Sequence, residues 1–217
     1  MGIKVIITGA TGMVGEGVLL TCLEHSGVSQ VLMVNRKHFE LQHDKLKELI
    51  VPDFLQVDKF AEQLKGYDAC FFCAGISSVG MAEEKYTHIT YDTTIHFAKV
   101  LAGLDKNIVF TYVSGSHTDS TEKGSLMWAR VKGRTENALK TIGFKAVYNF
   151  RPGAMKHYPG QKHSKMLYTA AVAVINLFAP KKICSLKEVG TAMINSVTKG
   201  YHTSTVEIED IHELARG

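Results

Sequence analysis

The fold of this chain is decided by the stretch Ile3-Lys4-Val5-Ile6-Ile7-Thr8-Gly9-Ala10-Thr11-Gly12-Met13-Val14-Gly15. An apolar, β-branched run of strand length stops at Gly9, and a helical pattern with apolar residues four apart starts near Met13. This succession of strand, glycine turn and helix is the opening unit of a dinucleotide-binding fold.

Each glycine of this loop is expected to have its own role. Gly9 lets the chain turn sharply off the strand, Gly12 leaves the backbone open to a pyrophosphate, and Gly15 lets the helix pack close to the sheet. The free N–H groups and the positive dipole end at the start of the helix would hold the anion. The predicted pyrophosphate-binding residues are Gly9, Thr11, Gly12, Met13 and Val14.

The composition is that of a soluble globular protein. The chain has 217 residues, of which 45% are hydrophobic and 21% charged. We expect a single domain over 1–217, with a core of about 1–152 and a substrate-side segment of about 153–217. The formal net charge is only +4, and Lys and Arg are spread along the chain. This pattern favours a small nucleotide over a nucleic acid as the anionic partner.

Several segments bear on location and on alternative chemistry. No signal peptide is recognisable, which predicts a cytoplasmic protein with reduced thiols. The pair Cys70 and Cys73 has C-x-x-C spacing but fits the end of a buried strand better than a redox or metal site. No metal site is expected from the His spacing. The uncharged run Met166 to Ala179 is too short to span a bilayer, so we expect a core or subunit-contact helix there.

Strand and helix patterns alternate along the chain, which predicts an α/β fold of the Rossmann type. Its parallel sheet is doubly wound, with a layer of helices on each face. Further strands are expected at 30–35, 50–57 (interrupted by Pro52), 67–73, 107–113 and 144–150, and helices at 41–49, 59–64, 82–104, 125–142, 164–178 and 186–199, followed by a terminal strand and helix.

The residues after the second strand predict the choice of cofactor. In this fold an acidic residue there binds the adenosine ribose and favours NAD. This chain has Arg36 and Lys37 instead. Arg36 could bind a 2′-phosphate through two hydrogen bonds, and Lys37 would add charge. We therefore prefer NADP to NAD, the alternative being a solvated basic turn.

Two more turns would lie against the cofactor. Asp53 and Phe54, after the third strand, are placed where adenine would lie. The residues that end the fourth strand would approach the adenosine ribose and the pyrophosphate; they are Cys73, Ala74 and Gly75. Each turn is also plausible as a plain surface turn.

The chain resembles an atypical short-chain dehydrogenase/reductase of the NAD(P)-binding, epimerase-like group, and most closely its Tat-interacting oxidoreductase-like branch. The G-x-x-G-x-x-G spacing of the loop is typical of this class. The other residues that carry the resemblance are Asn35-Arg36, Cys73-Ala74-Gly75, Val113-Ser114-Gly115, Val131-Lys132-Gly133, Arg151-Pro152-Gly153 and the tail Glu209 to Leu214.

The resemblance implies a catalytic Ser, Tyr and Lys, the last two as Y-x-x-x-K on one helix. Ser114 matches the serine, which contacts the substrate, and Lys132 matches the lysine, which binds the nicotinamide ribose. Pro152 and Gly153 would line the nicotinamide. The tyrosine position carries Trp128, whose indole N–H donates a hydrogen bond but does not transfer a proton at neutral pH.

The substitution at Trp128 leaves several functions open. The first hypothesis is an NADP(H)-dependent oxidoreductase that transfers hydride to a small carbonyl or quinone-like molecule, with a replacement proton donor or with none needed. The possible replacements are Tyr112, Lys156, His157 and Tyr158. The alternative is a catalytically degenerate NADP(H)-binding regulatory module, and a nucleotide-sugar epimerase is a weaker third. The long helices at 82–104 and 125–142 resemble those that pair in dimers of the family, which leaves a homodimer open.

Overall fold

The central strand of the sheet is β1 (Ile3–Thr8), whose last four residues are fully buried. In the computed structural model, which describes residues 2–162 and 182–217, β1 pairs in parallel with β2 (Val28–Asn35) and β4 (Ala69–Phe72). A strand covered on both faces needs a continuous apolar run rather than an alternating one, and β1 has such a run.

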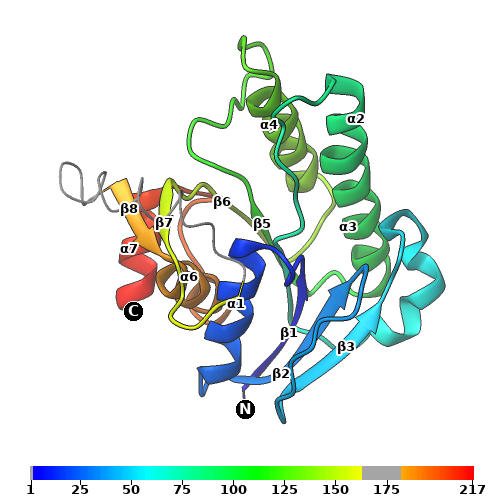
Figure 1. Cartoon of the computed structure of the whole chain (residues 1–217), viewed down its shortest axis with the longest axis vertical. Helices are drawn as coiled ribbons and strands as arrows, with labels where there is room; N and C mark the ends of the chain where they lie inside the picture. The colour runs from blue at the N-terminus through cyan, green and yellow to red at the C-terminus, as the bar shows by residue number, and fades with distance from the viewer. Residues whose placement is uncertain (1, 163–181) are drawn as a thin grey trace.

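Within the described residues, seven strands form one parallel sheet in the order β3-β2-β1-β4-β5-β6-β9 (Figure 1). The chain reverses its direction of travel across the sheet between β1 and β4, so a crevice opens outside the carboxyl ends of these two strands. This topology confirms the predicted doubly wound, three-layer fold. The remaining strands are β3 (Leu46–Ile50), β5 (Val109–Val113), β6 (Ala146–Phe150) and β9 (Thr205–Val206).

Helices cover both faces of the sheet (Figure 1). One layer contains α1 (Met13–Glu24), α6 (Leu186–Thr198) and α7 (Ile208–Arg216). The other contains a 3₁₀ segment, η1 (Phe54–Leu64), together with α3 (Thr93–Leu104) and α4 (Met127–Lys140). The helix expected at 82–104 is present as α2 (Glu83–Thr87), a π-helical turn, η2 (His88–Asp92), and α3.

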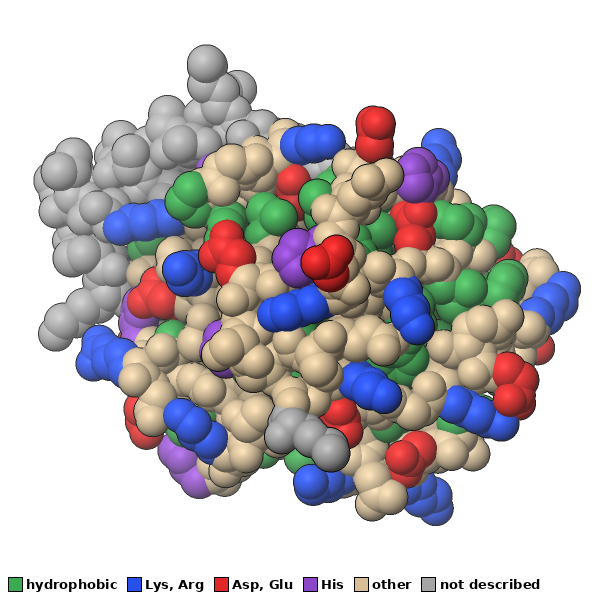
Figure 2. All heavy atoms as spheres, turned by 90° about the horizontal axis from the view of Figure 1, so that it is seen from below, with side chains coloured by type: hydrophobic (Ala, Val, Ile, Leu, Met, Phe, Trp, Pro, Cys, Tyr) green, Lys and Arg blue, Asp and Glu red, His purple; other side chains and the backbone are tan. Residues whose placement is uncertain are grey.

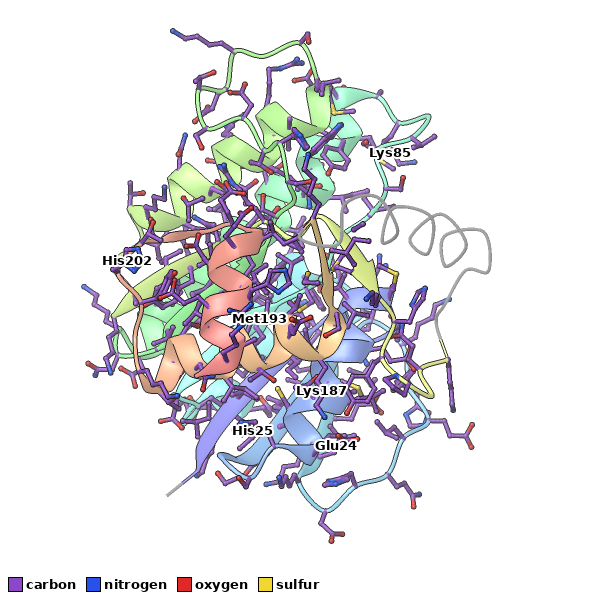
Figure 3. The ribbon with its side chains drawn as sticks, turned by 90° about the vertical axis from the view of Figure 1, so that its left-hand side faces the viewer. Glu24, His25, Lys85, Lys187, Met193 and His202 are labelled. Atoms are coloured by element: carbon purple, nitrogen blue, oxygen red, sulfur yellow. The ribbon has the colours of Figure 1, made fainter. Side chains whose placement is uncertain are left out.

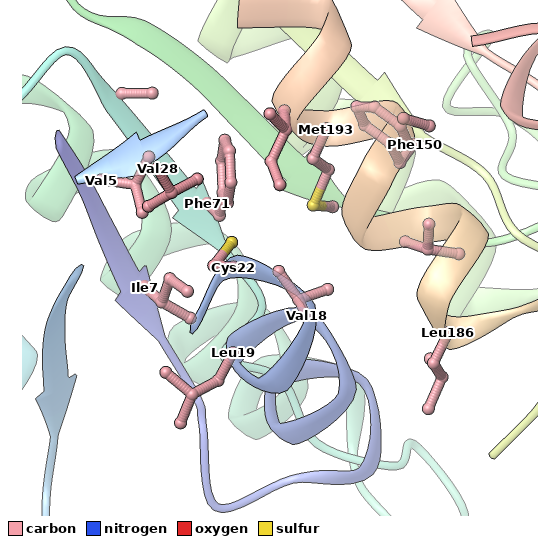
Figure 4. Packing of buried hydrophobic residues seen from close by; sticks show 14 of the residues in the cluster. Val5, Ile7, Val18, Leu19, Cys22, Val28, Phe71, Phe150, Leu186 and Met193 are labelled. Carbon is pink, nitrogen blue, oxygen red and sulfur yellow. The ribbon is translucent and has the colours of Figure 1, made fainter. Parts of the chain in front are cut away.

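Small residues let α1 and α6 approach closely in the first layer. A Cβ added at Gly17 would lie 2.6 Å from the Leu186 side chain, and one added at Gly190 would lie 2.7 Å from Thr21. The core beneath them joins β1 to both helices, and Figure 4 shows Val18 and Met193 among its members. The two helices and the sheet therefore share one continuous apolar cluster.

The region between β2 and β4 corrects the sequence prediction. The expected helix at 41–49 is wrong, because Leu46–Ile50 is the edge strand β3, paired with β2. The expected strand residues 54–57 belong to η1 instead. Pro52 follows β3, and the Asp53 carboxylate accepts a hydrogen bond from the Leu55 N–H, which starts the helical turns.

The described residues in the last third of the chain form a second small sheet and two helices on the main sheet. A second, two-stranded parallel sheet, β7 (Ala154–Lys156) with β8 (Ile183–Ser185), is a feature that the sequence did not predict. The helices α6 and α7 lie on the α1 side of the sheet. The helix expected at 164–178, with its apolar run, lies outside the described residues.

Basic residues are spread over the surface as they are along the sequence. On the face drawn in Figure 2, Lys and Arg side chains are interspersed with acidic ones. In residues 2–162 and 182–217, no helix combines the length and the apolar character needed to cross a membrane. The same residues contain no cluster of three or more His, Cys, Asp or Glu side chains able to hold a metal ion.

Two helical glycines give a test of how tightly α4 is packed. A Cβ at Gly133 would lie 1.8 Å from the Asp119 carbonyl oxygen, whereas one at Gly103 in α3 meets no atom within 4 Å. We expect Gly133→Ala to destabilise the protein by about 1–3 kcal/mol, because the loop must move. Gly103→Ala is the matched control and should stabilise it by about 0.5–1 kcal/mol. Urea unfolding measures both, and equal effects would contradict the close packing of α4.

Candidate cofactor and catalytic site

The glycine loop is held in one conformation by close backbone contacts. Gly9 has a φ of 71°, a left-handed conformation that favours glycine. A Cβ at Gly9 would lie 2.6 Å from the Ala74 backbone, and one at Gly15 would lie 2.1 Å from the Gly9 carbonyl oxygen. The Gly12 N–H donates to that same oxygen over 2.9 Å. The start of α1 therefore packs directly on the end of β1.

The N-terminus of α1 is open to an anion. Gly12 occupies the N-cap position, so no side chain caps the first turn. The first N–H groups of a helix have no partner within the helix, and they attract phosphate together with the dipole. Thr11 and Gly12 are exposed, and Met13 and Val14 are half-buried. The five residues predicted to hold a pyrophosphate thus surround an uncapped helix end.

The end of β4 lies against this loop. The Thr8 hydroxyl accepts a hydrogen bond of 3.2 Å from the Ala74 N–H. Cys73 and Ala74 are half-buried and Gly75 is exposed. The structure therefore brings two motifs of distant sequence to one edge of the sheet. Burial raises the pKa of the Cys73 thiol to about 12, so this thiol stays protonated and unreactive at neutral pH.

The end of β2 carries an unpaired buried amide beside two exposed cations. Asn35 is only 2% exposed, and neither side-chain polar atom has a hydrogen-bond partner among the described residues. Leaving a buried amide unpaired costs about 1–3 kcal/mol, so Asn35 has the capacity to pair with a water or a bound group. Arg36 and Lys37 follow, both exposed.

The side chains of Asp53 and Phe54 serve the fold. The Asp53 carboxylate caps η1. The Phe54 ring packs against Phe72 and Phe97, at centroid distances of 6.4 and 5.4 Å. The Phe54 ring is therefore committed to the core, whereas the Asp53 carboxylate is exposed and keeps acceptor sites beyond its capping bond, so the adenine contact stays a prediction.

Three candidate catalytic residues gather where β5 ends beside α4. Ser114 is buried, and its Oγ lies 2.8 Å from the Thr118 hydroxyl. The Lys132 Nζ donates to the Ser114 carbonyl oxygen over 2.7 Å. The Trp128 ring is half-buried and lies 3.9 Å from the position of a Cβ on Gly115. Ser116 N–H donates to the Pro152 carbonyl oxygen over 3.1 Å, which brings the predicted nicotinamide-lining loop to the same place.

Burial changes the acidity of Lys132. Desolvation lowers the pKa of its ammonium group to about 8, and the nearby Glu136 carboxylate opposes that shift in part. At neutral pH the group is still mostly charged, but it can release its proton far more readily than an exposed lysine.

Neither tyrosine named from the sequence is a suitable replacement proton donor. Tyr112 is buried against Phe72, and burial raises its pKa well above the ordinary value. The Tyr158 hydroxyl bonds to Glu24, near the C-terminal end of α1 (Figure 3), and burial is the main cause that raises its pKa to about 12. Both hydroxyls are therefore held in roles that stabilise the fold.

An ion pair that the sequence did not predict joins α4 to the nicotinamide-lining loop. Arg151 donates to both oxygens of the fully buried Glu136 carboxylate, over 2.9 and 2.5 Å. It also donates to Glu207 and to the Ser120 hydroxyl. Glu136 lies one helical turn after Lys132. The spacing of four residues could have shown that these two side chains are neighbours on α4, but it gives no sign of the pairing with Arg151.

The fold and this site define an NAD(P)-binding protein of the short-chain dehydrogenase/reductase class. The profile of the NAD dependent epimerase/dehydratase family matches residues 5–125, and the chain belongs to this family. This match confirms the expected atypical short-chain dehydrogenase/reductase.

Two solved structures share the fold. The enzyme WbmF of Bordetella bronchiseptica, in complex with NAD+, aligns with 99% of this chain and 77% of its own at 16% identity and a TM-score of 0.68. The carbonyl reductase Sniffer of Drosophila melanogaster aligns with 96% of this chain and 98% of its own, at 13% identity and a TM-score of 0.66. Identities this low show the fold alone.

A curated relative corrects the expected location. Protein fmp52, mitochondrial, of Aspergillus clavatus is 26% identical over 195 residues, which cover 85% of this chain and 79% of the relative. The cytoplasmic location expected from the sequence is contradicted by this name, which points to the mitochondrion.

The two acidic partners of Arg151 differ in burial and give a matched test. Glu136 is fully buried, whereas the Glu207 side chain is 45% exposed. We expect Glu136→Gln to cost about 3–5 kcal/mol of stability, because it leaves a buried charge without its partner. Glu207→Gln should cost less than about 1 kcal/mol. Denaturant unfolding of both variants checks this, and a small loss for Glu136→Gln would show that the pair is not critical to the fold.

Proposed function

We propose that this protein is an NADP(H)-dependent oxidoreductase acting on a small carbonyl or quinone-like molecule. The observation that carries the proposal is the pairing of Ser114 with Lys132 at the end of β5, on the sheet edge that also bears the uncapped start of α1. NADP(H), when bound, supplies or accepts the hydride.

The residues at this edge fit the nucleotide. The backbone of the glycine loop, from Gly9 to Val14, would hold the pyrophosphate. Arg36 and Lys37 would hold the 2′-phosphate, and the unpaired Asn35 amide is a candidate partner for the adenosine ribose. At the other end Lys132 would contact the nicotinamide ribose, and Pro152 and Gly153 would line the nicotinamide.

The proton donor we assign is Lys132. Its ammonium has the lowered pKa that a general acid needs near neutral pH, and it lies beside the serine assigned to the substrate. In the reducing direction the Ser114 hydroxyl would donate a hydrogen bond to the substrate carbonyl oxygen, and Nζ would give that oxygen its proton. Neither Tyr112 nor Tyr158 is needed.

A second function is favoured by Trp128. With indole at the family's tyrosine position, the chain could bind NADP(H) without turnover and act as a regulatory module. NADPH oxidation with a panel of aldehydes, ketones and quinones separates the two functions. Binding without turnover across the panel would support the module. A nucleotide-sugar epimerase is disfavoured because that chemistry relies on the missing tyrosine.

Cofactor choice can be measured with Trp128, the only tryptophan of the chain. We expect NADPH to quench its emission at lower concentration than NADH. Arg36→Ala should weaken NADPH binding about tenfold to a hundredfold, since charge-assisted hydrogen bonds are worth about 1.5–3 kcal/mol, and should leave NADH unaffected. Lys47→Ala removes an exposed cation from the adjacent strand and is the control. Equal binding of both nucleotides by the native protein would refute the role of Arg36.

The assignment of Lys132 predicts a pH profile. Only the protonated ammonium can act as acid, so the rate of carbonyl reduction should be level below pH 8 and fall about tenfold per pH unit above the pKa of about 8. Lys132→Met should abolish turnover, whereas Lys140→Met, which removes an exposed cation of the same helix, should not. A rate that stays level to pH 10 would rule out Lys132 as the donor.

A further inference from the structure

Exposed apolar side chains gather beside the proposed catalytic site. Among the described residues, the large hydrophobic side chains left exposed are Ile76, Val79 and Leu126, at 44%, 90% and 55%. Ile76 and Val79 belong to the loop that leaves β4, and Leu126 precedes α4. Single apolar residues scattered on a surface are ordinary, but these three all lie on the two loops that lead into α2 and α4.

The two loops are joined where they meet their helices. Arg130 of α4 donates to the Glu83 carboxylate at the start of α2 over 2.7 Å. The same guanidinium donates to the Gly124 and Ser125 carbonyl oxygens, just before Leu126. Figure 1 shows α2 beginning beside the N-terminal end of α4, where the two helices are in contact. The three apolar residues therefore lie on loops that a structural ion pair holds together.

Two of these apolar residues are close in sequence to residues assigned to the site. Ile76 directly follows Gly75, which is assigned to the cofactor, and Leu126 lies two residues before Trp128. A Cβ added at Gly75 would meet no atom within 4 Å, and one added at Gly115 would meet only the Trp128 ring, at 3.9 Å. There is thus open space beside Gly75, and the Trp128 ring is the group that faces Gly115.

Charge distinguishes the possible occupants of this surface. The nearby loop and helix-end residues carry charges of both signs. Glu83, Glu84 and Glu122 are acidic, and Lys85 and Lys123 are basic. A surface that docks on anionic lipid needs a cluster of Lys and Arg, which is not found in these two loops. A neutral apolar molecule needs no such basic cluster to bind there.

We propose that the substrate carries a hydrocarbon chain, which crosses Trp128 and contacts Ile76, Val79 and Leu126. The inference rests on the proposed function, because it takes the carbonyl end of the molecule to lie at Ser114. It assigns the aromatic ring of Trp128 a binding role in place of the proton transfer that a tyrosine would perform.

The test uses a series of methyl ketones from butan-2-one to decan-2-one, titrated into the protein loaded with NADP+, which has no hydride to give, and followed by Trp128 emission and calorimetry. Affinity should rise about twofold to fourfold with each added methylene until the chain passes the loops. The double variant Val79→Ser with Leu126→Ser should bind decan-2-one about tenfold more weakly and butan-2-one as before. Lys123→Ser, in the same loop as Leu126, is the control and should match the native protein.

Several outcomes would overturn the proposal. One is an affinity that does not change with chain length, and another is a double variant that keeps the chain-length dependence of the native protein. A third is a native protein that self-associates, or binds neutral phosphatidylcholine vesicles, and a double variant that does not. Either form of this third result would assign the surface to a second copy or to a membrane. The series is repeated without nucleotide and NADP+ is titrated alone, so a failure of cofactor binding would count against the proposed function and not against the apolar surface.

Discussion

The close approach of α1 to the end of β1 is the contact on which the rest of the structure depends. Gly15 has no Cβ, and only for that reason can the helix start directly on the Gly9 carbonyl oxygen. The helix axis then points at the crevice between β1 and β4, where Thr8 also fixes the Ala74 backbone. α6 packs on α1 through Gly17, so the whole layer on that face takes its position from this contact.

The other half of the site depends on the position of α4. Gly133 lets this helix lie against Asp119, and the buried pair of Glu136 with Arg151 joins it to the loop after β6. Lys132 lies between these two anchors. Its side chain is consequently held at the Ser114 carbonyl oxygen in a poorly solvated position, which is the physical cause of its lowered pKa. Packing and acidity at this residue have the same origin.

Sequence reasoning predicted the features that depend on local pattern. The order of strands and helices, the glycine loop and the gathering of Ser114, Trp128 and Lys132 all follow from spacing and from the rule that parallel strands end at one edge. The prediction failed at β3, because the mixed apolar and charged residues of Leu46–Ile50, an edge strand, also fit the pattern of a helix. The core packing of the Phe54 ring was not predicted, because no local signal tells a core aromatic from one that faces a ligand. Arg151 was noticed in its motif, but its partner is fixed by tertiary packing.

The open helix end has a consequence for the life of the protein in the cell. Gly12 supplies no side chain to cap α1, so the first backbone donors of the helix are left for water or for an anion. An anion that binds only the folded state stabilises that state by mass action. The fraction of chains that resist unfolding and proteolysis would then follow the supply of the nucleotide, and abundance would be coupled to metabolic state without any dedicated regulator.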